Sequence, residues 1–326
     1  MKNKEIKREY NKKIEKLIKL NKFYYEHNNP IVDDAKYDAL KKDILKLESK
    51  YPNLKDKNSP SVIVGFKPSK NFRKVLHRVP MLSLANAFDK NDLDNFEKKI
   101  TNYLNQKDRS LLEYSAEPKI DGISASLSYK AGVFITGLSR GDGKEGEDIT
   151  ENLKTVSDIP QRILSKDFPD DIEIRGEIFI KNNDFKKLTG KFANPRNAAS
   201  GSLRQKNPLE TKKIPLKFIA YTFGYEKGLK IYKQSEFLKK LKEWGFKTNP
   251  LNKTIKGIKN LMKNYKDIEN KRGSLDFDID GIVYKINDLN LQRRLGNIAN
   301  APRWAIAHKF SANNGISKIE NIEIQI

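Results

Sequence analysis

The spacing of apolar residues changes once along this chain, and that change restricts the fold to a helical segment followed by a mixed one. Up to residue 51, apolar side chains recur every three or four positions in two runs separated by Asn28-Asn29-Pro30, which predicts two helices. Asp33 or Asp34 is suited to cap the second helix. The apolar positions are Ile6, Tyr10, Ile14, Leu17 and Ile18 in the first run and Tyr37, Leu40, Ile44, Leu47 and Tyr51 in the second.

From about residue 111 the pattern is that of short strands. The runs 124–129 and 133–139 are separated by Lys130-Ala131-Gly132, which predicts a hairpin. Because the segments do not alternate as regular βαβ units, we expect an α+β fold with a largely antiparallel sheet. Further strands are predicted at 172–180, 216–222, 279–287 and 304–310, and helices at 90–104 and 230–244.

The stretch between the two patterns, residues 51–70, is typical of a linker because it holds Pro52, Pro60, Gly65 and Pro68. We therefore expect a small helical domain at residues 1–68, followed by a larger α+β domain.

Composition excludes several kinds of site. None of the 326 residues is cysteine, which rules out disulfides and cysteine-ligated zinc within this sequence, and only three are histidine. No apolar run approaches the roughly 18 residues of a membrane-spanning helix, and no secretory signal is visible, so a cytoplasmic protein is expected. The formal net charge of +22 fits a polyanionic partner such as nucleic acid and a lysine-rich solvated surface equally well.

Lys119, Asp121 and Gly122 form a K-x-D-G string at a strand-to-loop corner. A lysine amine attacks phosphorus only when it is unprotonated, and an ordinary lysine, with a pKa near 10.4, is almost fully charged at neutral pH. A nucleophilic lysine therefore needs burial or neighbouring cations. Taken alone, the string is better explained by a surface turn.

The surrounding segments favour a phosphate-binding site. Residues 140–148 hold three glycines among acidic residues, a composition that suits close backbone approach to a phosphate or a ribose. Lys285, in DIDGIVYK, and Lys309, in PRWAIAHKF, are each the lone cation on a strand face of otherwise small or apolar groups. Such a cation is costly unless it meets an anion such as a phosphate. For either lysine alone, a solvated edge strand remains an equal alternative.

In this order, the segments resemble the covalent nucleotidyltransferases, which comprise DNA and RNA ligases and capping enzymes. Three more segments resemble the bacterial NAD-dependent DNA ligases in particular: HRVPMLSLANAF at 77–88, FANPRNAASGSLRQ at 192–205 and YYEHNNPIVDDAKYD at 24–38, the last being similar to that family's NMN-recognition motif. The resemblance runs from about residue 15 to the C-terminus. It implies a nucleotidyltransferase domain at 69–317, ATP-grasp-like, with antiparallel sheets and helices.

The resemblance also implies a role for each matched residue. Lys119 would be the nucleophile that takes AMP from NAD and releases NMN, and Asp121 the second catalytic residue. The implied nucleotide contacts are Glu117, Ser83 and Leu84 at the adenine, Asp121 and Glu177 near the ribose and the metal, Arg140 at the ribose and phosphate, and Lys285 and Lys309 at the α-phosphate.

In the first domain, the resemblance implies a site for the NMN half of NAD. Family members often have histidine at the position of Tyr25, and either ring stacks on nicotinamide. Packing is an alternative role for Tyr37, which lies on the apolar helix face. Arg196 and Arg204 would bind the DNA backbone or the pyrophosphate, with a plain surface position as the alternative for Arg204. The implied NMN contacts are Tyr24, Tyr25, Asp34, Tyr37 and Asp38.

The family continues into an OB-fold, a four-cysteine zinc module, helix-hairpin-helix repeats and a BRCT domain, whereas this sequence stops at NIEIQI. We therefore expect residues 318–326 to begin a truncated OB-fold, zinc to be confined to the absent C-terminal part, and Mg²⁺ or Mn²⁺ to be held through phosphates. The expected activity is self-adenylation by a monomer. Transfer of AMP to the 5′-phosphate of nicked double-stranded DNA would need the absent domains.

The sequence leaves two alternatives open. An ATP-dependent nucleotidyltransferase would share the central lysine motif, but ATP has no nicotinamide for residues 24–38 to hold. A non-catalytic, basic nucleic-acid-binding module would explain the charge, but it gives no reason for Lys119, Glu117, Lys285 and Lys309 all to be present.

Overall fold

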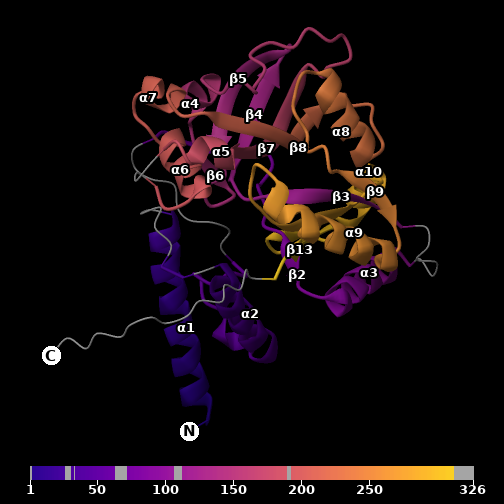
Figure 1. The fold of residues 1–326 in the computed structure, drawn as a ribbon. Helices are drawn as coiled ribbons and strands as arrows, with labels where there is room; N and C mark the ends of the chain where they lie inside the picture. The colour runs from indigo at the N-terminus through magenta and orange to yellow at the C-terminus, as the bar shows by residue number, and fades with distance from the viewer. Residues whose placement is uncertain are drawn as a thin grey trace, which may run out of the picture.

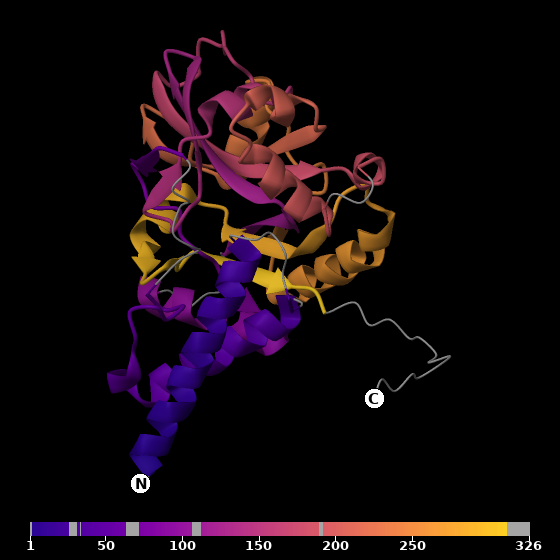
Figure 2. The ribbon, with the colours of Figure 1, turned by 90° about the vertical axis from the view of Figure 1, so that its left-hand side faces the viewer.

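A computed structural model describes residues 2–25, 31–32, 34–62, 72–105, 112–188 and 192–311, and it confirms the predicted α+β fold. Helices α1 (Lys2–Tyr25) and α2 (Asp34–Lys50) extend away from a larger part made of sheets and surrounding helices (Figures 1 and 2). The cap predicted at Asp33 and residues 63–70 of the predicted linker lie outside the described residues. The described part of the linker includes a short 3₁₀ helix, η1 (Pro52–Leu54).

Helices α1 and α2 pack against each other along most of the side chains that helical spacing predicted, but Ile6 and Tyr51 are not part of this core. Tyr10, Ile14, Leu17 and Ile44 form their buried core. Ile18, which was predicted to face the same way, is 41% exposed. The prediction for Ile18 is wrong because consecutive helical residues are about 100° apart, and Leu17 already occupies the inward position at that turn.

One sheet carries the predicted hairpin. Within the described residues it has four strands in the order β5-β4-β7-β8, all antiparallel to their neighbours. The turn between β4 and β5 has Ala131 and Gly132 at φ values of 45° and 73°, as the tight turn of a two-residue hairpin requires. The strands are β4 (Ile123–Lys130), β5 (Val133–Ser139), β7 (Asp171–Ile180) and β8 (Leu216–Lys227).

The other large sheet carries the lysine-bearing strands. In the part of the chain that the structure describes, its order is β2-β13-β10-β3-β9, and only β2 and β13 pair in parallel, so the largely antiparallel prediction is confirmed. Its strands are β2 (Ala85–Ala87), β3 (Glu113–Ile120), β9 (Lys253–Lys256), β10 (Ile279–Ile286) and β13 (Ala305–Lys309). Two small ladders pair β1 (Lys74–Leu76) with β6 (Glu145–Glu147), and β11 (Asn297–Ile298) with β12 (Ala301–Pro302).

Each large sheet has its own apolar core, covered by helices (Figure 1). Helix α8 (Gln234–Glu243) covers the first, and α3 (Lys90–Leu104) and α9 (Ile258–Lys271) cover the second. The bounds of α3 are those predicted, whereas α8 is shorter and α9 was not predicted. No helix in the described residues is both long and apolar enough to cross a membrane. The shorter helices are α4 (Thr150–Lys154), α5 (Asn182–Phe185), α6 (Pro195–Leu203), α7 (Pro208–Lys212), α10 (Leu289–Leu295) and the 3₁₀ helix η3 (Arg272–Ser274).

His308 on β13 makes the stability of this second core depend on pH. Its side chain is 1% exposed and stacks on Tyr265, with 4.0 Å between the ring centres. Burial lowers the pKa of His308 to about 4, and Asp89 and Asp92 offset only part of that effect. Folding thus favours the neutral imidazole. Its contribution is complete above the ordinary pKa of 6.5 and is lost as the pH falls through about 4.

We expect His308→Phe, which keeps an aromatic ring against Tyr265 but cannot titrate, to reduce the loss of unfolding free energy across this pH window. The reduction should be on the order of 3 kcal/mol, the free energy that corresponds to the lowering of the His308 pKa on folding. Urea denaturation of both proteins near neutral pH and near pH 4 measures it. Equal losses in the two proteins would mean that another group titrates.

Candidate active site

Lys119 and Lys309 lie on either side of Gly281 across three neighbouring strands. Strands β3 and β13 both pair with β10, and Gly281 is opposite Lys119 on one side and opposite Lys309 on the other. Residues directly opposite one another project from the same face of a sheet. Alternation along β10 puts Lys285 on this face too, so the predicted faces of Lys285 and Lys309 are confirmed.

Gly281 leaves the space in which the two lysines converge. A Cβ at this position would lie 2.3 Å from the carbonyl oxygen of His308 and 2.9 Å from the Cα of Lys309. Any side chain would therefore push β13 away from β10 and separate Lys309 from Lys119.

A β-bulge brings Asp280 to the same place. Ile279 is opposite Ile120 and Gly281 is opposite Lys119, so Asp280 is an extra residue without a partner on β3. Strict alternation would turn its side chain to the face opposite that of Gly281. The bulge re-aims it toward the lysines, which is a common use of bulges near active sites.

The Asp280 carboxylate joins the two lysines. Its Oδ2 lies 3.1 Å from Nζ of Lys119 and 3.5 Å from Nζ of Lys309. Burial by itself would raise the pKa of Asp280, but the two ammonium groups outweigh burial and hold this pKa below its ordinary value. The site therefore holds an anion between two cations. Lys119 remains 27% exposed and can be reached from the cleft.

Glu117 and Lys285 form an ion pair that is almost fully buried. Nζ lies 2.7 Å from Oε2, and the Lys285 and Glu117 side chains are 7% and 5% exposed. The other Glu117 oxygen accepts hydrogen bonds from Ser115 Oγ at 2.9 Å and Gln234 Nε2 at 3.0 Å. A buried carboxylate is tolerated here because both of its oxygens have partners.

The four-stranded sheet closes the other side of the site. Ser124 on β4 donates a hydrogen bond to Glu177 on β7 at 3.0 Å, and the carbonyl oxygen of Tyr221 on β8 accepts one from Lys285 at 3.0 Å. Burial raises the pKa of Glu177 above its ordinary value, although the charges of Lys119 and Arg196 offset part of this effect. The cleft thus presents a carboxylate with a raised pKa opposite a sheet face rich in lysine.

The N-terminal helices reach this cluster. Asp38 on α2 lies 2.7 Å from Nζ of Lys309, and the two side chains are 8% and 16% exposed. Tyr37 donates its hydroxyl hydrogen bond to Asn21 on α1 at 2.7 Å. A residue implied to hold NMN is thus in direct contact with one implied to hold the α-phosphate. The side chains of Tyr24, Tyr25 and Asp34 lie outside the described part of the structure.

A cleft of about 810 Å³ lies between the two sheets and the N-terminal helices. It brings together most of the residues that the sequence singled out. Those that line it are Tyr37, Asp38, Ser83, Leu84, Glu117, Lys119, Arg140, Glu177, Arg196, Lys285 and Lys309.

Asp121 and Arg204 are not among the residues that line this cleft. Asp121 accepts a hydrogen bond from Arg196 at 2.6 Å, which ties it to the cleft wall indirectly. Arg204 donates to Glu147, whose side chain is fully buried, at 3.0 Å. The guanidinium of Arg204 is therefore engaged with a carboxylate inside the protein.

Among the contact residues that the sequence analysis missed are Asp280, Gln234 and Tyr221. Asp280 stands within the DIDGIVYK segment, but a one-residue bulge leaves no mark in the alternation of side chains. Gln234 and Tyr221 come from segments far from Glu117 in sequence.

The described residues contain no group of three or more His, Cys, Asp or Glu side chains arranged to hold a metal ion.

Comparison with known proteins identifies relatives for both parts of the chain. The family model of the NAD-dependent DNA ligase adenylation domain matches residues 69–313, and that of the DNA ligase-like, N-terminal NAD+-binding domain matches residues 3–65. A solved structure of a mycobacterial DNA ligase D complexed with ATP and MES has a TM-score of 0.36 and 16% identity, covering 62% of this chain and 56% of its own. That likeness is too distant to bear on function.

Curated relatives are much more similar. The chain is 66% identical to a DNA ligase of Pelagibacter ubique over 326 residues, which is 100% of this chain and 48% of that protein. It is 46% identical to a DNA ligase of Parvibaculum lavamentivorans over 316 residues, 94% of this chain and 44% of that protein. The chain thus spans about half the length of these relatives. Because the adenylation-domain model matches well over half of its residues, the chain belongs to the NAD-dependent DNA ligase family.

Proposed function

We propose that this chain binds NAD and carries out the first step of DNA ligation, the transfer of AMP to its own Lys119. The observation that supports this most is the convergence of Lys119 and Lys309 on one anionic point, in a cleft that Asp38 reaches from the N-terminal helices. A phosphate at this point would take over the role that the Asp280 carboxylate has between the two cations. The cleft volume of about 810 Å³ is within the range of small-molecule sites, about 300–1,000 Å³.

The remaining lining of the cleft suits the two halves of NAD. The Glu117 carboxylate accepts hydrogen bonds and is proposed to receive the adenine amino group, beside Ser83 and Leu84. On the side of the N-terminal helices, an aromatic ring and a carboxylate suit the NMN half. The proposed NMN contacts are Tyr24, Tyr25, Asp34, Tyr37 and Asp38, and Arg140 is proposed at the ribose and phosphate.

In the proposed step, the unprotonated amine of Lys119 attacks the α-phosphorus of NAD. A P–N bond forms, the P–O bond to the NMN phosphate breaks, and NMN leaves with the bonding electrons while the nitrogen releases a proton to solvent. Lys309 and Lys285 are proposed to neutralise the charge that develops on the phosphate. The cleft walls are proposed to align the attacking nitrogen with the leaving oxygen. Asp121, held by Arg196, is proposed as the second catalytic residue.

A divalent ion, Mg²⁺ or Mn²⁺, is proposed to be held mainly through the phosphates of NAD, with Asp121 and Glu177 as the carboxylates beside it. When bound, such an ion offsets the charge of the pyrophosphate. Zinc is assigned to parts of the longer family members that lie outside this sequence.

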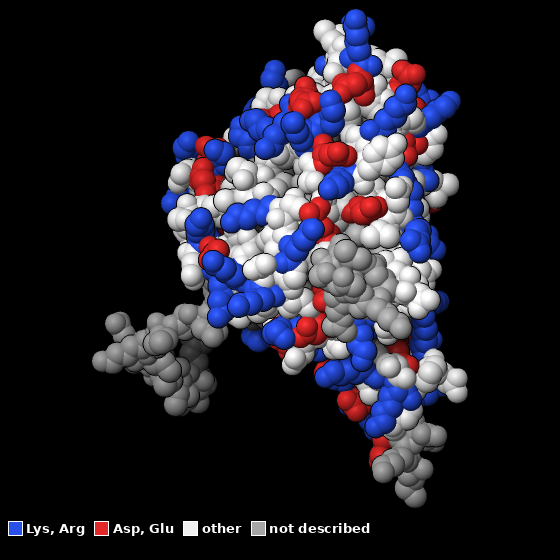
Figure 3. Space-filling model, turned by 90° about the vertical axis from the view of Figure 1, so that its right-hand side faces the viewer, with Lys and Arg blue, Asp and Glu red and all other residues white. Residues whose placement is uncertain are grey.

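The later steps are proposals about the whole protein, of which this chain spans about half. We assign residues 1–68 to an NMN-binding domain, 69–317 to the adenylation domain and 318–326 to the start of an OB-fold. The formal net charge is +22, and Lys and Arg are spread over the face drawn in Figure 3 with acidic residues between them. This charge favours association with DNA phosphates, with Arg196 and Arg204 as candidate contacts. The proposed substrate is nicked double-stranded DNA, sealed in the cytoplasm by a monomer.

Incubation with NAD and Mg²⁺ is expected to add one AMP to the protein, and incubation with ATP and Mg²⁺ to add none. The reason is that the proposed contacts of the N-terminal helices require a nicotinamide nucleotide, which ATP lacks. Intact mass spectrometry measures the adduct, and protein kept without nucleotide is the control. An adduct from ATP alone would identify an ATP-dependent nucleotidyltransferase. Salt-sensitive DNA binding without any adduct would favour a non-catalytic module.

A further inference from the structure

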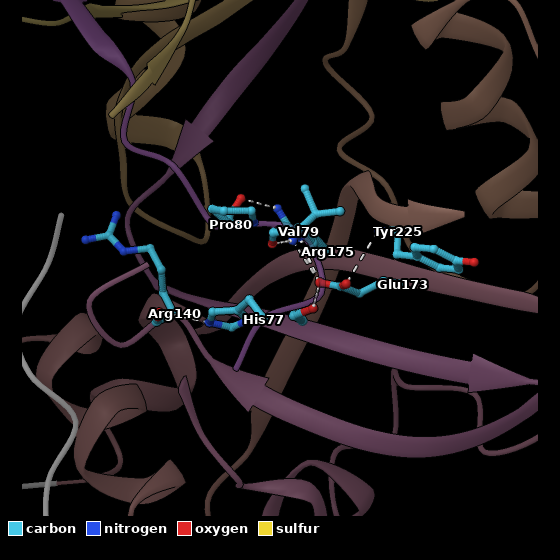
Figure 4. Close-up of polar contacts among 8 residues, drawn as sticks. His77, Val79, Pro80, Arg140, Glu173, Arg175 and Tyr225 are labelled. Carbon is cyan, nitrogen blue, oxygen red and sulfur yellow. Dashed lines mark hydrogen bonds and ion pairs between the residues drawn. The ribbon is translucent and has the colours of Figure 1, made fainter. Parts of the chain in front are cut away.

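We infer that Arg175 is a positioning residue for adenylation, because it holds one wall of the cleft in place through backbone carbonyls (Figure 4). The inference rests on the proposed function, since its consequence is the binding of NAD in this cleft. Arg175 lies on β7, in the sheet opposite Lys119, and is 8% exposed.

The wall in question is the segment between β1 and β2, which has no regular secondary structure. It begins at His77, whose Nε2 lies 3.0 Å from the carbonyl oxygen of Arg140. The backbone N–H groups of Met81 and Ser83 donate to carbonyl oxygens of distant loops, each at 2.8 Å. Few backbone bonds hold the segment, although a continuous run of it lines the cleft: Val79, Pro80, Met81, Leu82, Ser83 and Leu84.

The guanidinium of Arg175 supplies hydrogen-bond donors to this segment, which pairs with no strand in the part of the chain that the structure describes. Nη1 donates to the carbonyl oxygen of Pro80 at 3.1 Å, and Nη2 donates to that of Val79. Nε and Nη2 also donate to Oε1 of Glu173, at 3.1 and 2.8 Å. Each of the three nitrogens thus has an acceptor within the protein, so the group is directed at the segment and at Glu173.

Glu173 in turn fixes the guanidinium. It is 2% exposed, accepts a hydrogen bond from Ser126 Oγ on Oε1, and accepts one from the backbone N–H of Tyr225 at 3.4 Å on Oε2 (Figure 4). Gly224 admits the pair, because a Cβ there would lie 2.6 Å from Nη2 of Arg175 and 2.7 Å from Cδ of Glu173. Charge, hydrogen bonds and space therefore all favour this placement of Arg175.

Lysine cannot replace this arrangement. The planar guanidinium serves two successive carbonyls and one carboxylate at once, whereas an ammonium is a single point of charge on a flexible stem. Without the fork, the carbonyls of Val79 and Pro80 lose their donors. The segment that leads to Ser83 and Leu84 at the proposed adenine site then loses two of its anchors, although Ser83 keeps its own backbone bond. Arg175 bonds to the cleft wall and not to Lys119. Its replacement should therefore weaken NAD binding and leave the chemical step at Lys119 unchanged.

We expect Arg175→Lys to raise the apparent KM for NAD about tenfold, the effect of losing roughly one net hydrogen bond. This constant is the NAD concentration at which the adduct forms at half its maximal rate. The rate of adduct formation at saturating NAD should change by less than about twofold. Arg162→Lys, the same exchange at an exposed arginine that does not line the cleft, should change neither constant. A lower saturating rate with an unchanged KM, or no change in either constant, overturns the inference.

Amide hydrogen exchange of the nucleotide-free protein tests the same inference without activity. In both Arg175→Lys and Glu173→Gln, exchange at Met81 and Ser83 should be at least about tenfold faster, while the amides of β10 stay unchanged. Unchanged exchange at Met81 and Ser83, or equal acceleration throughout the protein, overturns the inference. If the unaltered protein forms no adduct with NAD, the proposed function fails, and the exchange result still decides the role of Arg175.

Discussion

Replacement of Lys119 by alanine is expected to lower the rate of AMP adduct formation from NAD by at least about a thousandfold, the scale of losing a nucleophile. Lys119 combines access from the cleft, at 27% exposure, with a position 3.1 Å from the anion that it shares with Lys309. Intact mass after incubation with NAD and Mg²⁺ measures the result. Folding should survive the change, because Asp280 keeps Lys309 as a partner.

Two variants sharpen this test. Lys119→Arg keeps a positive charge beside Asp280, but a guanidinium stays protonated at neutral pH, so this variant should form the adduct as slowly as Lys119→Ala does. Lys187→Ala removes a lysine whose side chain is 74% exposed, and it should form the adduct at the original rate. An adduct that persists in Lys119→Ala would place the nucleophile elsewhere, and peptide mapping of that adduct would identify it.

The second large effect is expected from breaking the buried pair of Glu117 and Lys285. Lys285→Met keeps most of the side-chain length but leaves the Glu117 carboxylate buried at 5% exposure without its ammonium. An uncompensated buried charge costs about 3–5 kcal/mol of unfolding free energy. Urea denaturation near neutral pH measures the loss. As a control, Lys187→Ala removes the surface ion pair between Lys187 and Asp184, and it should cost less than about 1 kcal/mol of unfolding free energy.

A double-mutant cycle tells the loss of this pair apart from a general packing defect. Combining Lys285→Met with Glu117→Gln removes both charges and keeps an oxygen for Ser115 and Gln234. The loss in the double variant should be smaller than the sum of the two single losses by at least about 1 kcal/mol. Additive losses would mean that the two side chains do not stabilise each other through their charges.

Local patterns were sufficient for several elements of this fold. Helix α3 has the bounds predicted from its own spacing, and the hairpin turn at Ala131 and Gly132 follows from the chemistry of two residues. Such features depend on neighbours in sequence. Helix α9 was not predicted, although Ile258, Leu261, Tyr265 and Ile268 recur at helical spacing and are buried.

In strand β7, the alternation of side chains does not predict which residues are buried. Its apolar residues face the core as the alternation indicates, yet Glu173, Arg175 and Glu177 on the other face are buried as well. The sequence offered no reason to expect three buried charges in a row of alternate positions. They are buried because a second sheet and the segment 79–84 cover that face, and they are tolerated because Ser124, Ser126 and backbone groups satisfy them.

The sequence by itself determined the class of fold, the family and the strand faces of Lys285 and Lys309, because side-chain alternation and ordered motifs are properties of short segments. Only the tertiary structure decided what those lysines meet. In the folded protein Lys285 pairs with Glu117, and a bulge turns Asp280 toward Lys119. Lys309 contacts Asp38, which precedes it by 271 positions in the sequence. Such contacts arise where distant strands and helices come into register, and no local pattern encodes the distance between them.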